Sequence, residues 1–405
     1  MVYHKRQIEA YLTREIDFYP AILLTGPRQV GKSTLLRHLM ETERTYVSLD
    51  DPNIRNLAIY SPELFFQRYQ PPLLIDEIQY APGLFPYIKI FIDELGQNNL
   101  FWLTGSQLFP LMQGVQESLA GRVRVLQLNG FSYKEFLGIE QSPFAKSLEE
   151  LTEANAQKGA QLETTLPEII LRGSMPRVLL QEGIDISGYY QSYVDTYISR
   201  DVREITNVMD THLFLRFVKL LATRTGQELN LSSLARDLAV DASTIRRWLD
   251  ILVTSGLILE LPAFSGNFGK RLVKRPKLYF TDTGLATYLL GIRDQQTWAD
   301  SPYQGPLFEN WVVTEIDKSF KHNGLKPNMF YCRDSNQQEI DLIIEQAGQI
   351  FPYEIKLSDH PQVSDKHFSV LTKLEDKIPY YGVICPCKHL TPLSQRTWKL
   401  PASFL

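Results

Sequence analysis

Apolar and polar residues follow two different periods over the first 138 residues. Short continuous apolar runs, typical of buried strands, recur between segments whose apolar residues repeat at helical spacing. The runs predict strands within residues 21–25, 45–51, 71–79, 99–107 and 117–132. The segments between them predict helices within 1–20, after 33, and at 61–69 and 84–96. Because strands that alternate with helices form parallel sheets, we expect an α/β domain that binds its ligand at the strand carboxyl ends.

Beyond residue 138 helical periodicity dominates until the last hundred residues. Residues 140–166 are polar and charge-rich without a clear apolar stripe, which is typical of a linker or an exposed helical insertion. Residues 229–290 predict two short helices followed by two strands, the order of a winged helix. An amphipathic helix at 307–320 and three strands after it predict a final α+β domain.

Length and composition limit the function classes. A chain of 405 residues is long enough for two to four domains. Its formal net charge of −4 argues against a broadly positive surface that binds nucleic acid, although it permits local basic patches. Three cysteines cannot form a disulfide framework, no apolar run reaches membrane-spanning length, and the first residues lack a signal-peptide core. We therefore expect a cytoplasmic protein that does not bind a membrane.

The segment GPRQVGKST, between a strand-like run and a helical segment, fits the pattern G-x-x-x-x-G-K-[ST]. In this pattern backbone N–H groups and a helix N-terminus surround phosphate oxygens. The lysine reaches the β- and γ-phosphates, and the hydroxyl after it binds Mg²⁺. We therefore expect ATP and Mg²⁺ as ligands. The predicted binding residues are Gly26, Pro27, Arg28, Gln29, Val30, Gly31, Lys32, Ser33 and Thr34, with Ser33 on the metal.

Four further residues are candidates for a role in ATP hydrolysis. Asp76 and Glu77 end a buried strand, where the first is placed to hold Mg²⁺ and the second to polarise the attacking water. Ser106 ends the next strand and is a candidate polar sensor of the γ-phosphate, or else a helix cap. Arg122 is a candidate for stabilising transferred charge, in its own pocket or in a neighbouring copy, or else a surface arginine.

Basic residues gather on the predicted winged helix. On its second helix Arg246 and Arg247 are expected to face outward, and the segment GKRLVKRPK would form the wing. The candidate DNA-contacting residues are Arg246, Arg247, Lys270, Arg271, Lys274 and Arg275. Contacts to DNA phosphates are one interpretation, and a packing lid or an oligomer surface is the other.

Three carboxylates and a lysine in the last hundred residues form a second group that could bind a metal ion or take part in catalysis. Glu309 lies near the start of the amphipathic helix, Asp341 on one strand, and Glu354 and Lys356 on the next. Residues two apart on a strand share a face, so Glu354 and Lys356 point the same way. Carboxylate oxygens suit a second divalent metal, and a nearby lysine could activate water. A structural set of ion pairs is the alternative.

Taken together, these segments resemble a prokaryotic family of AAA-type P-loop ATPases with a C-terminal PD-(D/E)xK-like domain. The matching segments are GPRQVGKST, LLIDEIQ, LTGSQ, SLAGRV, ISRDV, PKLYFTDTGLA, LFENWVV and EIDLII with YEIKLS. The resemblance implies an ATPase domain at 1–138, a helical linker or lid at 139–228, a winged helix at 229–300 and a nuclease-like domain at 301–405.

Three hypotheses follow from the chemistry and the resemblance. The chain is a nucleotide-driven switch that engages DNA, an ATP-dependent regulatory protein whose C-terminal regions bind other proteins, or a nuclease whose ATPase gates access. Arginines like Arg122 often act on a neighbour's nucleotide, so self-association is also expected.

Overall fold

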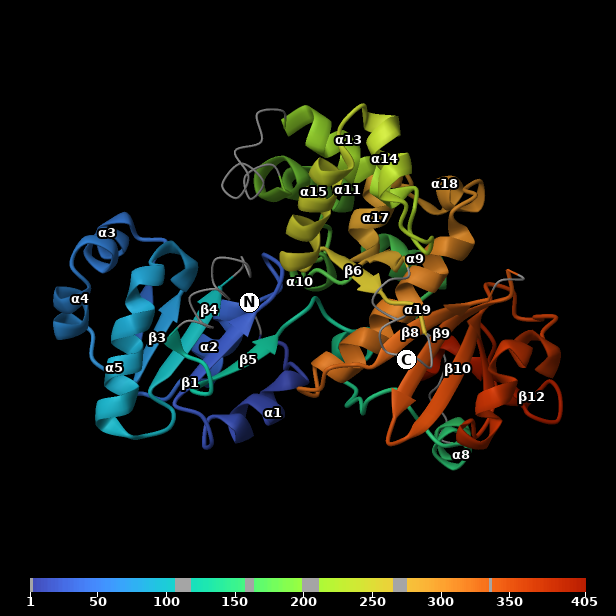
Figure 1. Ribbon diagram of the computed structural model, residues 1–405, viewed down its shortest axis with the longest axis horizontal. Helices are drawn as coiled ribbons and strands as arrows, with labels where there is room; N and C mark the ends of the chain where they lie inside the picture. Colours follow the sequence, from blue (N-terminus) through green and yellow to red (C-terminus); the bar gives the residue numbers. More distant parts are fainter. Residues whose placement is uncertain (1–2, 106–117, 157–163, 199–210, 265–274, 335–336) are drawn as a thin grey trace.

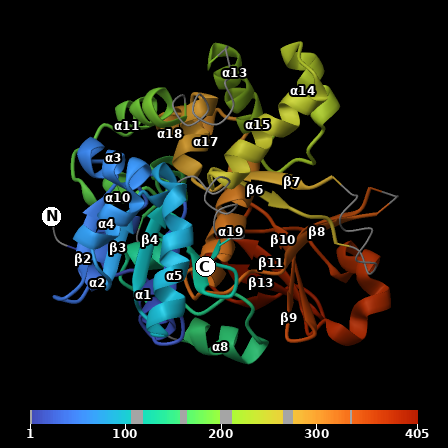
Figure 2. The same cartoon turned by 60° about the vertical axis from the view of Figure 1, so that its left-hand side comes forward.

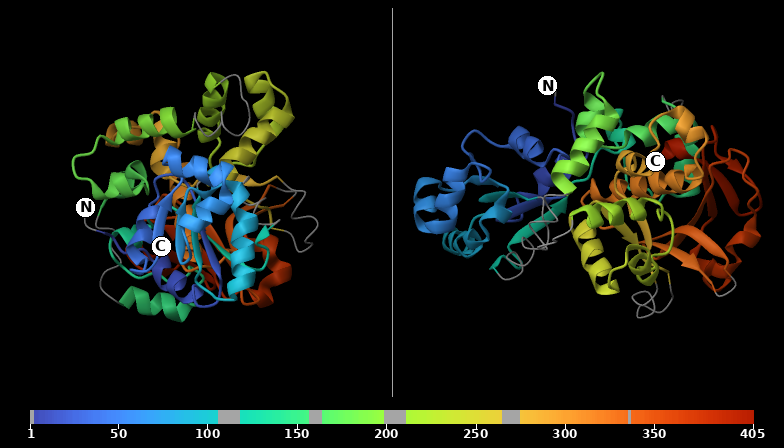
Figure 3. Two further views of the ribbon diagram at one scale, coloured as in Figure 1. Left: turned by 90° about the vertical axis from the view of Figure 1, so that its left-hand side faces the viewer. Right: turned by 90° about the horizontal axis from the view of Figure 1, so that it is seen from above.

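The computed structural model describes residues 3–105, 118–156, 164–198, 211–264, 275–334 and 337–405. A parallel sheet with its helices lies at one end of the molecule, a mixed sheet at the other, and a helical region above and between them (Figure 1). Seen from above, the two sheets occupy opposite ends (Figure 3). Within the described residues no helix combines the length and the apolar character needed to span a bilayer.

The first sheet has five parallel strands in the order β2-β3-β4-β1-β5. Its strands are β1 (Ala21–Thr25), β2 (Thr45–Ser48), β3 (Leu73–Asp76), β4 (Phe101–Gly105) and β5 (Val123–Gln127). All five strands fall within the predicted segments, and the α/β prediction is confirmed. The carboxyl ends of β1, β3 and β4 are neighbours, which places residues that follow these strands at one edge of the sheet.

Alternation along the strands gives the sheet two buried faces. Ile22 and Leu24 of β1 pack with α1 and α2, whereas Ala21 and Leu23 pack with the helices of the other face. The helices are α1 (Ile8–Glu15), α2 (Lys32–Leu39), α3 (Pro52–Tyr60), α4 (Pro62–Arg68) and α5 (Phe85–Leu95), with short turns η1 (Ile78–Tyr80) and η2 (Pro82–Leu84). Helix α3 was not predicted; it begins with Pro52, and the Asp51 side chain caps it by accepting from Asn53 N at 2.8 Å.

The middle of the chain is mainly helical, with one antiparallel strand pair. Its helices are α7 (Tyr133–Phe136), α8 (Leu148–Ala156), α9 (Leu166–Arg172), α10 (Pro176–Leu180), α11 (Ile186–Tyr193), η3 (Val194–Ile198), α13 (Thr211–Ala222), α14 (Leu231–Leu238), α15 (Ala242–Thr254), α17 (Thr283–Leu290) and α18 (Gln295–Ala299). β6 (Ile258–Leu261) pairs with β7 (Lys277–Phe280) after α14 and α15, so the predicted order of elements is present.

Residues 140–156 pack against the C-terminal mixed sheet, which a linker would not do. Phe144 and Leu151 are buried, and Phe144 contacts the ring of Tyr353 on the mixed sheet at 5.7 Å. The amide of Leu390 donates to Asn155 Oδ1 at 2.9 Å. The sequence showed no apolar stripe here because only a few apolar side chains of this segment are buried.

The C-terminal region consists of one long helix and a six-stranded mixed sheet in the order β12-β13-β11-β10-β9-β8. Its elements are α19 (Gln304–Lys321), β8 (Met329–Arg333), β9 (Glu339–Gln346), β10 (Gln349–Ile355), η4 (Asp365–Lys377), β11 (Tyr381–Cys385), β12 (Thr391–Pro392), β13 (Thr397–Pro401) and η5 (Ala402–Phe404). The three predicted strands are β8, β9 and β10, which pair antiparallel in that order. The α+β prediction for this region is confirmed.

Helix α19 runs through the centre of the molecule, between the two sheets (Figure 2). Residues 307–320 include apolar and polar side chains, and almost all of them are buried. Asn310 accepts from the amide of Phe280 at 2.8 Å and donates to its carbonyl at 2.7 Å, which fixes α19 against β7. On the other side, Asp317 Oδ2 accepts from Asn129 Nδ2 at 3.3 Å, just after β5. The helix therefore joins all three regions.

A buried charge network ties the end of α19 to the loop after β1. Arg6 donates to the carbonyls of Val30 and Asn129, both at 2.9 Å, and pairs with Glu135 at 3.3 Å. His322 Nδ1, at the end of α19, lies 2.9 Å from Glu135 Oε2. Burial opposes the charged form of Glu135, but the charges of Arg6 and His322 outweigh it and lower its pKa below the ordinary value.

We expect Glu135→Gln to destabilise the fold at neutral pH by about 3–5 kcal/mol, because it breaks a buried ion pair. Since the folded-state pKa of Glu135 is depressed, its stabilising effect is present above the ordinary glutamate value of 4.5 and declines as the pH falls below it. Urea unfolding across this pH range measures the difference from wild type. Glu140→Gln, at an exposed pair with Lys5, is the control and should change little. An equal loss in both variants, or a loss independent of pH, would contradict this account.

Candidate functional site

The loop between β1 and α2 has the conformation that its glycines make possible. Gly26 has φ 138° and Gly31 has φ 94°, both in the region that favours glycine. A Cβ on Gly26 would lie 2.0 Å from the carbonyl oxygen of Leu128, so no other residue fits there without a shift of the backbone. The loop leads directly into α2, which begins at Lys32. This arrangement suits a phosphate group at a helix N-terminus.

Lys32 is held at the loop by its own backbone. Its Nζ donates to the carbonyls of Gly26 at 3.0 Å and Pro27 at 2.8 Å, and the side chain is buried. The ammonium group thus lies beside the turn that would surround phosphate oxygens. Of the other predicted loop residues, Val30 is buried, Arg28 is half-buried, and Gln29 and Thr34 are exposed.

Asp76 lies beside Ser33, as the sequence predicted for two groups that share Mg²⁺. The Ser33 hydroxyl donates to Asp76 Oδ1 at 2.6 Å. Tyr46 donates to Asp76 Oδ2 at 2.9 Å, and Thr104 donates to the other oxygen. Burial, followed by the charge of Asp76, raises the pKa of Tyr46 to about 12. Serine and aspartate oxygens are suitable Mg²⁺ ligands, so the residues fit the ion.

Sequence reasoning did not identify Tyr46 and Thr104 as site residues. Thr104 could have been identified, because it is the penultimate residue of β4, beside β3, and strand carboxyl ends carry ligand-binding residues. Its hydroxyl accepts from the amide of Glu77 at 3.1 Å. Glu77 itself has φ 57°, an unusual conformation for a non-glycine residue, and its carboxylate accepts from Gln79. The conformation turns the chain sharply at the end of β3.

Arg122 is not near the loop that follows β1. It directly precedes β5, and the β1–β5 register pairs Ala21 with Val123, so Arg122 lies at the strand amino ends. It forms a two-pronged ion pair with Asp93 of α5, at 2.7 and 3.1 Å. A five-residue strand separates this end from the loop, so a role in its own pocket is wrong. A role on a neighbouring copy stays a prediction, and Ser106 lies outside the described residues.

The middle region contacts the loop directly at two points. Tyr189 of α11 donates its hydroxyl hydrogen to Gln29 Oε1 at 2.8 Å. Gly256, in the turn between α15 and β6, lies so close that a Cβ there would be 3.0 Å from Pro27 Cδ. The threonine hydroxyl of Thr281, just after β7, donates to the carbonyl of Gly256 at 2.6 Å. A continuous series of contacts therefore connects the loop to α15 and to the β6–β7 pair.

The candidate DNA-contacting residues differ in their surroundings. Arg246 is paired with Asp250 at 2.7 Å and Glu260 at 3.3 Å, which neutralises much of its charge. Arg247 and Arg275 are exposed. Lys270, Arg271 and Lys274 lie outside the described residues. The structure therefore leaves Arg247 and Arg275 as the described candidates for phosphate contact.

The structure brings Glu309, Asp341, Glu354 and Lys356 into one cluster but adds a second lysine to it. Lys277 of β7 lies 2.9 Å from Glu309 and 2.5 Å from Glu339, and Lys356 lies 2.6 Å from Glu354 and 3.4 Å from Asp341. Among the described residues, no group of three or more acidic, histidine or cysteine side chains is arranged to hold a metal ion. The predicted second metal site is therefore not supported, because lysine ammonium groups pair with its carboxylates.

Burial and mutual repulsion govern protonation in this cluster. Burial and the charge of Asp341 raise the pKa of Glu309 to about 7 and that of Glu354 to about 8. Burial opposes the charged form of Lys277, but the charges of Glu309, Asp341 and Glu339 outweigh it and raise its pKa. The negative charge of the cluster thus depends on its lysines.

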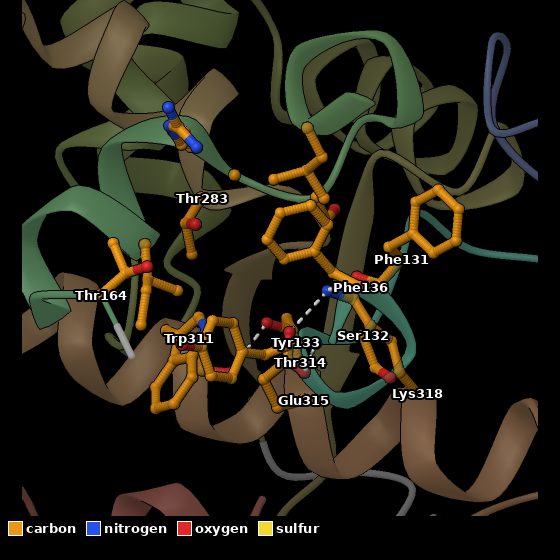
Figure 4. Close-up of a pocket in the computed structure, with 15 residues that line it drawn as sticks. Phe131, Ser132, Tyr133, Phe136, Thr164, Thr283, Trp311, Thr314, Glu315 and Lys318 are labelled. Carbon is orange, nitrogen blue, oxygen red and sulfur yellow. Dashed lines mark hydrogen bonds and ion pairs between the residues drawn. The ribbon is translucent and has the colours of Figure 1, made fainter. Parts of the chain in front are cut away.

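A small cavity lies between α19 and the segment after β5 (Figure 4). Its buried ion pair joins Glu315 and Lys318 at 2.8 Å. Glu315 also accepts from the amide of Tyr133 at 2.8 Å, and Lys318 donates to the carbonyl of Phe131 at 3.1 Å. The charges are therefore satisfied within the protein.

Comparison with known proteins bears on the first region. Residues 19–137 match a family described as an AAA domain, and residues 163–296 and 304–405 match two families described as domains of unknown function, DUF8612 and DUF4143. With the parallel sheet, the AAA match over residues 19–137 supports a nucleotide-binding, AAA-type P-loop domain in this part of the chain.

Two relatives match almost the whole chain. Uncharacterized proteins of Mycobacterium tuberculosis and Mycobacterium bovis are each 29% identical to it over 405 residues, covering 99% of this chain and 84% of theirs. The Walker-type ATPase of Pyrococcus abyssi aligns with 16% identity and a TM-score of 0.44, over 71% of this chain and 96% of that one.

Proposed function

We propose that this protein is an ATP-hydrolysing switch whose nucleotide site is coupled to a DNA-contacting segment in the middle of the chain. The observation that carries the proposal is the double contact of the phosphate-binding loop with Tyr189 and Gly256. A nucleotide that settles in the loop must act on residues that already touch α11 and the turn after α15.

Five residues have proposed roles in ATP turnover. Lys32 binds the β- and γ-phosphates, and Ser33 and Asp76 hold Mg²⁺, which would neutralise charge on those phosphates. Glu77, at the strand end beside Asp76, orients the attacking water as general base. Thr104 holds the chain turn at Glu77 through the amide of that residue, so it is a positioning residue.

DNA contact is proposed for the exposed arginines of the segment that the loop touches. Arg247 lies on α15, which ends two residues before Gly256, and Arg275 lies two residues before the start of β7. A change in the loop at Pro27 would reach α15 and the β6–β7 pair through that glycine and Thr281. Phosphate contacts of this kind position a protein on DNA without reading its sequence.

One observation favours the alternative, an ATP-dependent protein that binds another protein. Large apolar side chains are exposed around the junction of α3 and α4: Tyr60 is 80% exposed, Leu64 53% and Ile59 45%. Neighbouring exposed apolar residues of this kind often mark contact surfaces. This surface lies on the AAA-type domain, so a partner there could respond to nucleotide without any DNA.

We expect Lys32→Ala to abolish ATP binding and Glu77→Gln to preserve binding while stopping hydrolysis. The first substitution removes the charge that meets the phosphates, and the second removes the group that orients water. Loss of hydrolysis of about a hundredfold or more is expected for Glu77→Gln. Fluorescent-nucleotide titration and phosphate release measure the two quantities. ATP affinity that is unchanged in Lys32→Ala would refute the site.

DNA affinity should fall steeply as salt rises, and Arg247→Ala and Arg275→Ala should each reduce the log–log slope by about one. Arg246→Ala is the matched control, because Asp250 and Glu260 already pair with that arginine. It should change the slope less. Fluorescence anisotropy with duplex DNA, in ATP and without nucleotide, measures both the slope and the coupling.

Absence of DNA binding even at low salt would reject the DNA assignment. In that case a partner captured only in the ATP-bound state, and lost on Tyr60→Ser, would support the protein-binding alternative.

A further inference from the structure

The C-terminal carboxylate cluster already contains a cation, and it comes from another region of the chain. Lys277 of β7 is 2% exposed. Its Nζ lies 2.9 Å from Glu309 Oε1, 2.5 Å from Glu339 Oε1 and 3.7 Å from Asp341 Oδ1. These carboxylates belong to α19 and β9. One ammonium group therefore joins the β6–β7 pair to both elements.

Further contacts involve Glu354, the second oxygen of Asp341, and Glu309. Lys356 pairs with Glu354 and Asp341, and the amide of Ile355 donates to Asp341 Oδ2 at 2.8 Å. Tyr279 donates its hydroxyl hydrogen to Glu309 Oε1 at 2.6 Å. Two lysines thus oppose the four carboxylates of Glu309, Glu339, Asp341 and Glu354. Arg333 adds a third positive charge, with its Nε 3.6 Å from Glu339 Oε2.

A divalent metal at this point would have to compete with Lys277. Metal ions bind carboxylate oxygens at roughly 2.0–2.6 Å, so the ion would need the space that the ammonium group takes. Displaced, Lys277 would keep its charge in a buried position without its partners, which is costly. Its backbone cannot follow freely, because β7 pairs with β6 at Leu261 and is bonded to Asn310 through Phe280.

We propose that Lys277 is the resident cation of this cluster, and that the C-terminal region uses the cluster to hold the β6–β7 pair instead of binding a divalent metal. The carboxylates predicted a second divalent-metal site from the sequence, and the donor set found in the structure does not fit one. The site is instead an ion-pair lock between the middle and C-terminal regions. This inference does not depend on ATP hydrolysis or on DNA binding.

The first test measures metal binding by the full chain without nucleotide. Free Mn²⁺ is followed by electron paramagnetic resonance during titration of wild type and Asp341→Asn. We expect the two proteins to bind Mn²⁺ equally, with no site that requires Asp341. One saturable site in wild type that Asp341→Asn removes would overturn the proposal.

The second test asks whether the cluster needs the lysine. Lys277→Met should lower the midpoint of thermal unfolding by several degrees, whereas Lys326→Met, at an exposed lysine, should leave it unchanged. Mn²⁺ should partly restore the midpoint of Lys277→Met, and the further substitution Asp341→Asn should remove this effect. A wild-type midpoint in Lys277→Met would overturn the proposal. If that variant fails to fold, the titration of wild type against Asp341→Asn still decides.

Discussion

Helix α19 is buried although it carries several polar side chains. The arrangement of the rest of the structure depends on the hydrogen bonds that these side chains form. Buried polar groups require partners, and each of three such groups on α19 finds its partner on a different segment. Asn310 bonds to β7, Glu315 to the amide of Tyr133, and Asp317 to Asn129 after β5. The helix therefore fixes the three regions in one register. A shift of α19 by a single turn would break contacts to all of them at once.

Two buried aspartates, Asp76 and Asp341, differ in the groups that surround their carboxylates. Asp76 accepts hydrogen bonds from the hydroxyls of Ser33, Tyr46 and Thr104, which bring no positive charge. Asp341 is paired instead with lysine ammonium groups. The first environment favours a divalent cation, and the second already supplies cations from the protein. Both sites therefore contain buried carboxylates but, within the described part of the chain, only the nucleotide site leaves its buried carboxylate, that of Asp76, without a protein cation.

Local patterns predicted the parts of the site that are adjacent in sequence. The loop from Gly26 to Lys32 and the strand end at Asp76 follow from spacing and strand order, because backbone geometry fixes them locally. Lys277 could not be predicted, since only the packing of β7 on α19 brings it to carboxylates far along the chain. The role of Arg122 in its own pocket was wrong for a different reason: the sequence placed this residue before the last strand, and in a parallel sheet that is the end opposite the nucleotide loop.

The central claim is that the nucleotide loop and the middle region respond together, through Gly256 and Tyr189. Amide hydrogen exchange of the Glu77→Gln protein, with and without ATP, tests it most directly. The account predicts altered exchange in the turn at residues 255–258 and in α11, as well as in the loop, and no such change in Lys32→Ala. Changes confined to residues 19–137 would contradict it, because the loop would then bind nucleotide without affecting the segments that touch it.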